Sequence, residues 1–390
     1  MIHSNTEILF ELIRAGLWGD VKVNGYRLKV KESAIDWGVV YRLAEEQSVI
    51  GLVAAGIEVV QGAWLKVHGS PLVPQGWALQ FIGQTLQLEQ RNKAMNAFVA
   101  SLFDKMNCAG INALLVKGQG IAQCYEKPLW RAYGDVDLFL SEENYEKAKE
   151  LLMPLASSVE KEYEREKHLG MTIDEWLVEL HGRLYCGLSS RIERELDDVY
   201  KDTFCKGNVR SWMNDKVQVF QLFVENDVFY VFTHILQHFY KEGVGLRQIC
   251  DWCRLLYTYR ESLNHGLLEQ RINRAGLMSE WRAFTAVAVD YLGMPSDAMP
   301  FYDKSTKWNR KAKRIVEFVM MSGNMGHNRD SWLRAHDSWL SRQFVVRKSL
   351  SMFRRVGDLV RHARIFPLDS LRFSFTILKN GVMSAVRGEG

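Results

Sequence analysis

Hydrophobic residues recur at helical spacing through most of the first 110 residues. A short apolar face lies near the N-terminus, and a longer one runs from residue 79 to residue 106, where apolar side chains return every three or four positions. The longer stripe consists of Phe81, Leu86, Leu88, Met95, Phe98, Leu102 and Phe103. Gly110 follows and is suited to end the helix, because glycine adopts the left-handed conformation common after a helix C-terminus. We therefore predict a helical N-terminal region.

The pattern changes to that of strands between residues 113 and 140. Ala113–Val116 is a short apolar run, and the alternation that follows residue 134 places Asp135 and Asp137 on one face of a strand. The opposite face, made of Val136, Leu138 and Leu140, is apolar and suited to a core. Residues 141–152 then read as a helix capped by Ser141.

A third strand is predicted over residues 176–181. Here Trp176, Val178 and Leu180 share one face, whereas Leu177, Glu179 and His181 share the other. Two polar side chains on one strand face are costly to bury without partners, so they indicate either a polar site or a partly exposed strand. Both interpretations remain open on the pattern alone.

The two aspartates lie close to a turn that contains glycines. Carboxylates side by side repel each other unless a cation lies between them, and Mg²⁺ prefers oxygen ligands. The turn begins Lys117-Gly118-Gln119-Gly120, where glycine permits close approach of a phosphate and lysine supplies a positive charge. This combination predicts phosphoryl or nucleotidyl transfer, with Mg²⁺ as the cofactor and Mn²⁺ as the alternative ion.

Three segments carry a resemblance to a known family. Residues 114–118 (LLVKG), 129–131 (LWR) and 134–140 (GDVDLFL) resemble an uncharacterised bacterial nucleotidyltransferase family within the DNA-polymerase-beta-like nucleotidyltransferase superfamily. The resemblance extends over about residues 37 to 330. The chain departs from the superfamily pattern at Gln119, where Gly or Ser is usual, and in the length of the spacer before Asp135.

The resemblance implies a role for each candidate residue. Asp135, Asp137 and a third carboxylate on a later strand, Glu179, would hold the metal, and Glu179 is alternatively a proton acceptor. His181 matches a histidine that this family often carries after that carboxylate and would act beside it in catalysis. The NTP substrate would contact Lys117, Gly118, Gln119, Arg131 and Arg247. For Arg247 a second interpretation is an ion pair with Asp251, one helical turn away.

Residues after 226 again follow a helical pattern, and two motifs there resemble metal or redox sites. His234 and His238 are four residues apart, but Gln237 stands where a zinc protease has glutamate, so we predict a helix face near the nucleotide pocket instead. Cys250 and Cys253 form a C-x-x-C on an amphipathic helix without a thioredoxin-like context, so no redox role is predicted. The loop that follows Met321 contains glycines, asparagines and a histidine, and is read as a turn or as part of the site wall.

The predicted fold class is α+β, with a small mixed-sheet core flanked by helical regions. We divide the chain into an N-terminal helical region (1–110), a nucleotidyltransferase α/β core (111–215), a helical domain (216–300) and a basic helical C-terminal region (301–390). Six scattered cysteines do not form a disulfide framework, and no apolar run is long enough to span a membrane. A cytoplasmic location is therefore expected.

The charge distribution does not identify the acceptor of the predicted transfer reaction. The last 90 residues hold 18 basic and 7 acidic residues, whereas the first 300 hold 32 basic and 39 acidic residues. A basic region can bind nucleic acid, or its arginines can simply be solvated. Two alternatives to a nucleotidyltransferase therefore stay in view: a nucleotide-binding regulatory protein without catalysis, and a toxin-like enzyme that modifies RNA or tRNA. The acceptor is predicted only as a small molecule, a protein or RNA.

Overall fold

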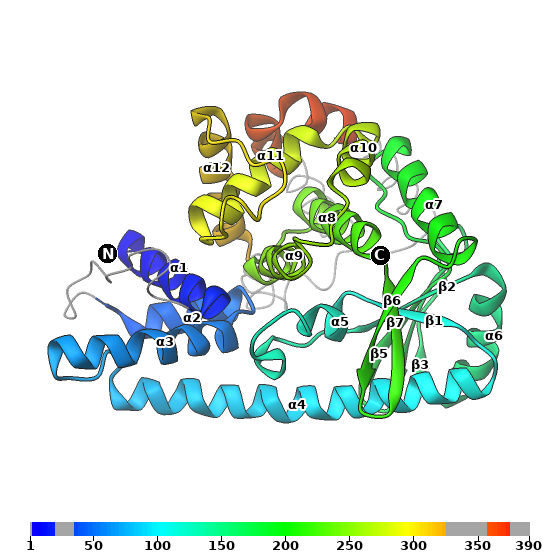
Figure 1. Ribbon diagram of the computed structural model, residues 1–390, viewed down its shortest axis with the longest axis horizontal. Coiled ribbons are helices and arrows are strands. Elements are labelled where there is room, and N and C mark those ends of the chain that lie inside the picture. The colour runs from blue at the N-terminus through cyan, green and yellow to red at the C-terminus, as the bar shows by residue number, and fades with distance from the viewer. Residues whose placement is uncertain (1, 20–34, 325–356, 375–390) are drawn as a thin grey trace, which may run out of the picture.

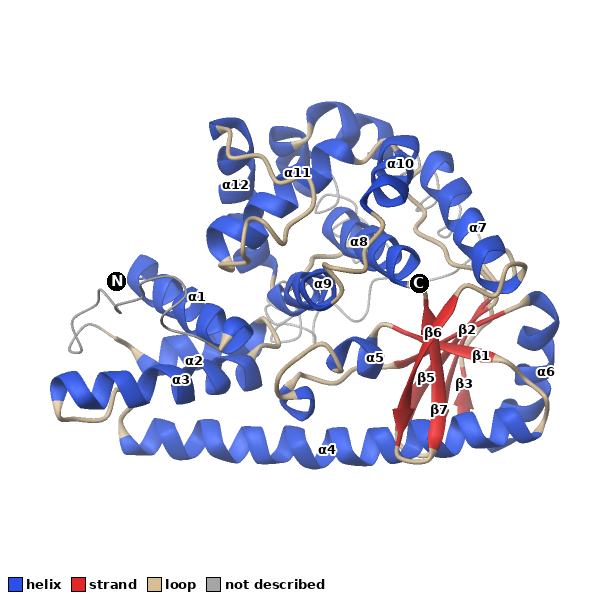
Figure 2. Cartoon of the chain, in the orientation of Figure 1, coloured by secondary structure: helices blue, strands red, loops and turns tan. Residues whose placement is uncertain are grey.

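The candidate site residues lie on a seven-stranded mixed sheet (Figures 1 and 2). The computed structural model describes residues 2–19, 35–324 and 357–374. The strand order is β3-β4-β5-β2-β1-β7-β6. The bounds are β1 (Ala113–Val116), β2 (Val136–Leu140), β3 (Ala156–Val159), β4 (His168–Ile173), β5 (Trp176–His181), β6 (Val209–Asn214) and β7 (Val217–Leu222). The α+β prediction is confirmed.

The centre of the sheet combines both strand directions. β2 runs antiparallel to β1 and parallel to β5, whereas β1 runs parallel to β7. The predicted strands at residues 113–116 and 176–181 have the expected bounds, and β2 begins at Val136, one residue after Asp135. β3, β4, β6 and β7 enlarge the predicted small sheet. Because β7 pairs with both β6 and β1, the sheet continues past the boundary that we placed between residues 215 and 216.

The two faces of the sheet pack into two different hydrophobic clusters. The inward side chains of β1, β2, β4 and β5 pack with α4 (Gln75–Cys108) and α6 (Glu142–Leu152) on one face. Leu114, Val116 and Phe139 belong to the other cluster, which includes α7 (Ser190–Phe204) and α8 (Val224–Lys241). The period of two along β2 and β5 therefore directs Asp137 and Glu179 away from the α4 face.

The N-terminal helices extend from the sheet along α4, which runs beneath them and beneath the strands in Figure 1. They are α1 (Ile2–Trp18), α2 (Trp37–Glu46) and α3 (Ile50–His68). α1 and α3 cross closely, because a Cβ added at Gly56 would lie 1.9 Å from the backbone oxygen of Leu12. The described residues of this region are mainly helical, as predicted, whereas residues 20–34 lie outside the described part of the chain.

The remaining helices form a second helical part above the sheet in Figure 2. They are α9 (Leu246–Thr258), α10 (His265–Ala275), α11 (Met278–Ala286), the π-helical turn η4 (Val287–Tyr291) and α12 (Thr306–Ser322), with further helices at 357–365 and 367–374. Short elements are α5 (Gly118–Ala122), η2 (Pro128–Trp130) and η3 (Met153–Leu155). Within the described ranges, none of the helices has the length and apolar character that crossing a membrane requires. Much of the basic C-terminal region, with the loop residues from Met325 to Arg329, lies outside the described residues.

A buried carboxyl group in the second helical part should make stability depend on pH. Glu280 on α11 is fully buried and accepts a hydrogen bond from the Tyr240 hydroxyl at 3.2 Å. Burial, and then the negative charge of Asp369, raises the pKa of Glu280 to about 8. Between about pH 5 and pH 8, Glu280 therefore keeps its proton in the folded protein but has lost it in the unfolded chain. Because the folded state binds more protons in this window, this group makes stability fall as pH rises through it.

We therefore expect the unfolding free energy of Glu280→Gln to increase relative to that of the wild type as pH rises from about 5 to about 8. Denaturant unfolding at a series of pH values measures this difference. Glu269→Gln, which replaces an exposed glutamate on α10, is the matched control. Parallel pH profiles for Glu280→Gln and the wild type would contradict the assignment.

Candidate active site

Three carboxylates from two adjacent strands meet on the face of the sheet opposite α4. β2 and β5 pair in parallel so that Asp137 lies beside Glu179, and Asp135 precedes β2 by one residue. One oxygen from each of Asp135, Asp137 and Glu179 lies within 4.8 Å of the others. The geometry thus brings together the three carboxylates that were predicted to share a metal.

Asp137 is the most enclosed of the three, with 1% of its side chain exposed. Its Oδ1 accepts hydrogen bonds from Lys117 Nζ at 2.8 Å and lies 2.9 Å from His181 Nε2. Its Oδ2 is buried and has no hydrogen-bond partner among the described residues. The charge of Asp137, and then burial, raises the pKa of Asp135. An unpartnered buried oxygen and mutual repulsion between carboxylates fit a set of cation ligands.

Glu179 and His181 continue the polar face of β5. Burial would raise the pKa of Glu179, but hydrogen bonds with His168 and His181 and the charge of Lys117 lower it well below its ordinary range. Burial would lower the pKa of His181, but its hydrogen bonds to Asp137 and Glu179 outweigh burial and raise it. Both side chains therefore face the predicted site, as the alternation along the strand indicated.

Lys117 enters the site because of an unusual backbone conformation. It follows the last residue of β1 and has φ +58° and ψ −147°, and φ of Gly118, the first residue of α5, is +45°. A positive φ is unfavourable for lysine, and such strain is found where surrounding structure enforces it. Burial would lower the pKa of Lys117, yet Asp137 and the neighbouring negative groups raise it. The amine therefore carries its positive charge beside Asp137.

Gln119 does not turn its side chain to the site. Its amide nitrogen donates to the side-chain oxygens of Asn92 and Asn96 on α4, at 3.1 and 2.8 Å, and the residue is buried. The expected contact of Gln119 with phosphate is thereby restricted to its backbone N–H at the start of α5. The polar side chain that departs from the family pattern instead attaches α5 to α4.

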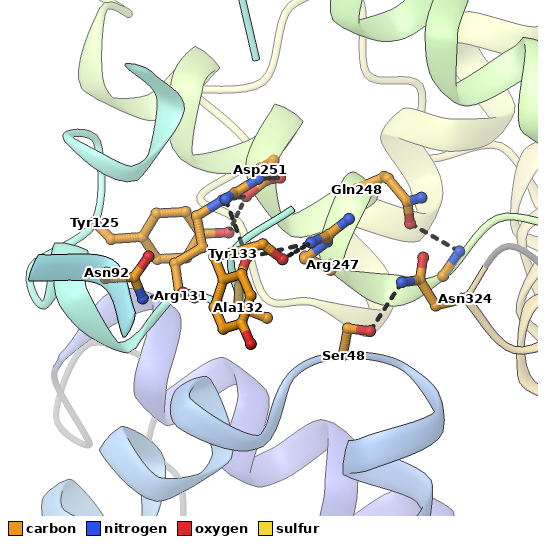
Figure 3. A network of polar contacts seen from close by, with 11 residues as sticks. Ser48, Asn92, Tyr125, Arg131, Ala132, Tyr133, Arg247, Gln248, Asp251 and Asn324 are labelled. Carbon is orange, nitrogen blue, oxygen red and sulfur yellow. Dashed lines mark hydrogen bonds and ion pairs between the residues drawn. The ribbon is translucent and has the colours of Figure 1, made fainter. Parts of the chain in front are cut away.

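The two arginines predicted to contact NTP form the network in Figure 3. Arg131 binds Asp251 through two hydrogen bonds, Nε to Oδ1 at 2.8 Å and Nη2 to Oδ2 at 2.7 Å, and both side chains are buried. Asp251 therefore pairs with Arg131, and the alternative pair with Arg247 is wrong. Tyr125 also donates its hydroxyl to Asp251, at 2.8 Å. Arg131 is thus already neutralised by protein, which weakens the expectation that it binds phosphate.

Arg247 supports the segment that leads to the first aspartate. Its Nη1 donates to the backbone oxygens of Ala132 and Tyr133, at 3.2 and 2.8 Å. Its Nε is buried, and no group in the described part of the chain accepts a hydrogen bond from it. Asn92 holds the same segment from the other side, through the backbone oxygens of Leu129 and Arg131. α4 and α9 therefore fix the loop before β2 and with it the position of Asp135 (Figure 3).

The three carboxylates, with Lys117, His181 and the two arginines, border a cavity of about 320 Å³ between the sheet and helices α8 and α9. α8 contributes Tyr230, His234 and His238, and the Nε2 atoms of the two histidines lie 3.0 Å apart. Burial, and then the positive charge of Lys117, lowers the pKa of His234 well below its ordinary value. The prediction that this helix face lies near the nucleotide pocket agrees with the position of α8 on the cavity.

Sequence reasoning missed His168 as a site residue. It lies on β4, and its Nε2 is 3.2 Å from Glu179 Oε2. The residues before it, from 160 to 166, are strongly charged and indicate an exposed turn or an edge strand, so no site residue was predicted there. The signal that could have found it is the apolar alternation that follows in Leu169, Met171 and Ile173.

The chain matches a family model described as an uncharacterised nucleotidyltransferase, over residues 33–293. The match covers more than half of the chain, including the whole sheet, and ends before the end of the predicted resemblance at about residue 330. No curated protein and no solved structure matches the chain.

Proposed function

Because the chain belongs to this uncharacterised nucleotidyltransferase family, we propose that it transfers a nucleoside monophosphate from an NTP to an acceptor in a reaction that depends on Mg²⁺. The observation that carries the proposal is the convergence of Asp135, Asp137 and Glu179 on one point of the cavity. Three oxygen donors from a rigid pair of strands suit a hard cation, which prefers carboxylate ligands. The acceptor is a small molecule, a protein or RNA.

The same three residues are the proposed metal ligands. The buried Oδ2 of Asp137 supplies a lone pair that no group in residues 2–19, 35–324 or 357–374 satisfies, which fits a bound cation. When bound, the ion would neutralise the triphosphate and align the attacking and leaving oxygens. The paired strands would hold the carboxylates in place, so that binding requires little rearrangement of the sheet.

Cationic groups of the cavity would orient the triphosphate. Lys117 places its amine beside Asp137, where the α-phosphate would approach the metal ligands. Arg247 has no ion-pair partner within the described residues, and its unsatisfied Nε can donate to a phosphate oxygen. Gly118 and Gln119 would contribute backbone N–H groups at the start of α5.

An isotope experiment tests the proposal. The protein is incubated with each NTP, Mg²⁺ and a lysate as the acceptor source, with the label in either the α- or the γ-phosphate. We expect the α-label to appear in the modified acceptor and the γ-label to leave as pyrophosphate, and we expect neither product with a chelator or with the double variant Asp135→Asn/Asp137→Asn. Transfer of the γ-label would instead indicate a kinase reaction. NTP binding without transfer of either label would favour the regulatory alternative.

The role of Glu179 gives a separate prediction. Because its carboxylate lies in the same ligand set as Asp135 and Asp137, we expect Glu179→Gln to weaken both Mg²⁺–NTP binding and turnover. Calorimetry and the transfer assay measure the two effects on the same samples. If the variant binds Mg²⁺–NTP with wild-type affinity and loses only turnover, Glu179 acts as the proton acceptor instead. Glu175→Gln, at an exposed position just before β5, is the control.

A further inference from the structure

We propose that His168, Glu179 and His181 form a second cation site, selective for a divalent transition metal such as Zn²⁺ or Co²⁺. The site adjoins the all-carboxylate set and shares Glu179 with it. It goes beyond the proposed transfer reaction, because its ligands include two imidazoles that a Mg²⁺ site does not use.

The pairing of β4 with β5 builds this site. The two strands are antiparallel, and His168 lies directly opposite His181. Directly opposed residues share a face of the sheet, and Glu179 shares the face of His181 because it is two residues away. The two imidazole rings consequently lie side by side, with their centroids 4.8 Å apart. The three ligands therefore stand on a rigid element and need no loop to close.

The distances between donor atoms match those around one metal ion. His168 Nε2 lies 3.2 Å from Glu179 Oε2, and His181 Nε2 lies 3.5 Å from the same oxygen. Zinc bonds to nitrogen and oxygen are about 2.0–2.2 Å long, which places tetrahedral ligands about 3.3–3.6 Å from one another. Asp137 Oδ1, 2.9 Å from His181 Nε2, borders the same space. A single ion can therefore contact all three side chains with small adjustments.

Partial exposure leaves one coordination position for an exchangeable ligand. The side chains of His168, Glu179 and His181 are 23%, 20% and 13% exposed, and all three border the cavity. Three protein ligands and an open fourth position are characteristic of catalytic zinc sites, whereas structural zinc sites are closed by four protein ligands. A metal held here would face the space in which substrates bind.

The local charges also leave room for a cation. Asp135, Asp137 and Glu179 contribute three carboxylates, whereas Lys117, in its ion pair with Asp137, and Arg247 contribute two positive charges. Glu166 adds a further carboxylate to the cavity wall. A divalent ion at the histidines would thus reduce an excess of negative charge, and the phosphates of an NTP would balance a second ion.

A binding experiment on the full-length chain tests the site. Protein freed of metal with a chelator is dialysed against Zn²⁺ in the presence of a large excess of Mg²⁺, which occupies the all-carboxylate set. Cys108 and Cys205 are exposed, so both are replaced by serine in every sample. We expect one Zn²⁺ per chain, and we expect His168→Gln to lower the Zn²⁺ affinity by more than about 100-fold, because loss of an outer-shell partner alone lowers it about 10- to 100-fold.

Three variants separate this site from its neighbours. Asp135→Asn should keep the Zn²⁺ and lose Mg²⁺–NTP binding, so the outcome for Zn²⁺ does not depend on the proposed transfer reaction. His238→Gln tests the nearby pair of His234 and His238, and His265→Gln replaces an exposed histidine on α10. Both should bind Zn²⁺ like the parent protein.

Zinc-edge X-ray absorption on the parent protein needs no substitution at the site, so it remains decisive if His168→Gln does not fold. Two imidazole nitrogens in the zinc shell support the proposal. The proposal is overturned if no Zn²⁺ is retained against Mg²⁺, if the zinc shell lacks imidazole, or if His238→Gln and not His168→Gln releases the ion.

Discussion

Asp137→Asn should reduce NTP-dependent transfer by more than about 100-fold, because loss of an outer-shell partner alone lowers metal affinity or activity about 10- to 100-fold and Asp137 is a proposed ligand. The substitution keeps the size of the side chain but removes its charge. It also removes the anionic partner of Lys117, whose Nζ lies 2.8 Å from Oδ1. The amine would then be free to bind phosphate without the metal, so residual NTP affinity should no longer depend on Mg²⁺.

Initial rates of α-label transfer and NTP affinity with and without Mg²⁺ measure both effects. Asp104→Asn, at an exposed position on α4, controls for the change in net charge. Wild-type rates in Asp137→Asn would show that this carboxylate has a structural role, and they would contradict the proposed metal set.

Asp251→Ala should destabilise the protein by about 3–5 kcal/mol, because removing one partner of a buried ion pair leaves an uncompensated buried charge. Arg131 and Asp251 are 5% and 6% exposed at their side chains, and two hydrogen bonds join them. The loss also frees the Tyr125 hydroxyl. Denaturant unfolding of the wild type and the variant measures the change in free energy.

The double variant Arg131→Met/Asp251→Leu provides the control for this prediction. With both charges replaced by apolar side chains, most of the stability should return, because no buried charge is left unpaired. A loss below about 1 kcal/mol in Asp251→Ala, as for an exposed pair, would contradict the buried role of the network. A double variant as unstable as the single one would show that packing, and not charge, determines the effect.

The predicted strands are those whose own sequence pattern shows which of their side chains are buried. Residues 113–116 are apolar on both faces, and residues 176–181 alternate, so both patterns indicate strands without knowledge of their neighbours. β6 and β7 have polar residues on part of their buried surface, such as Asn214 and Gln221, and do not show that alternation. They become strands because each finds a partner in the sheet.

The residues of the candidate site also fall into those that one strand's pattern predicts and those that depend on pairing between strands. Asp135, Asp137, Glu179 and His181 could be predicted to share a face, because the period of two acts within each strand. The alternation after His168 could have indicated its strand, but its position beside Glu179 could not be predicted, since that depends on the register of β4 against β5. The partner of Arg131 is also a property of the folded chain: Asp251 lies 120 residues further along, and nothing near Arg131 in sequence indicates it.

The most direct test of the central claim is a crystal structure of the wild-type protein with Mn²⁺ and an NTP analogue in which carbon replaces the oxygen between the α- and β-phosphates. Anomalous scattering locates the manganese independently of the protein. We predict a manganese ion within about 2.3 Å of oxygens from Asp135, Asp137 and Glu179, in contact with the phosphates of a nucleotide in the cavity. A nucleotide bound elsewhere, or a nucleotide in the cavity whose metal contacts none of these carboxylates, would contradict the account.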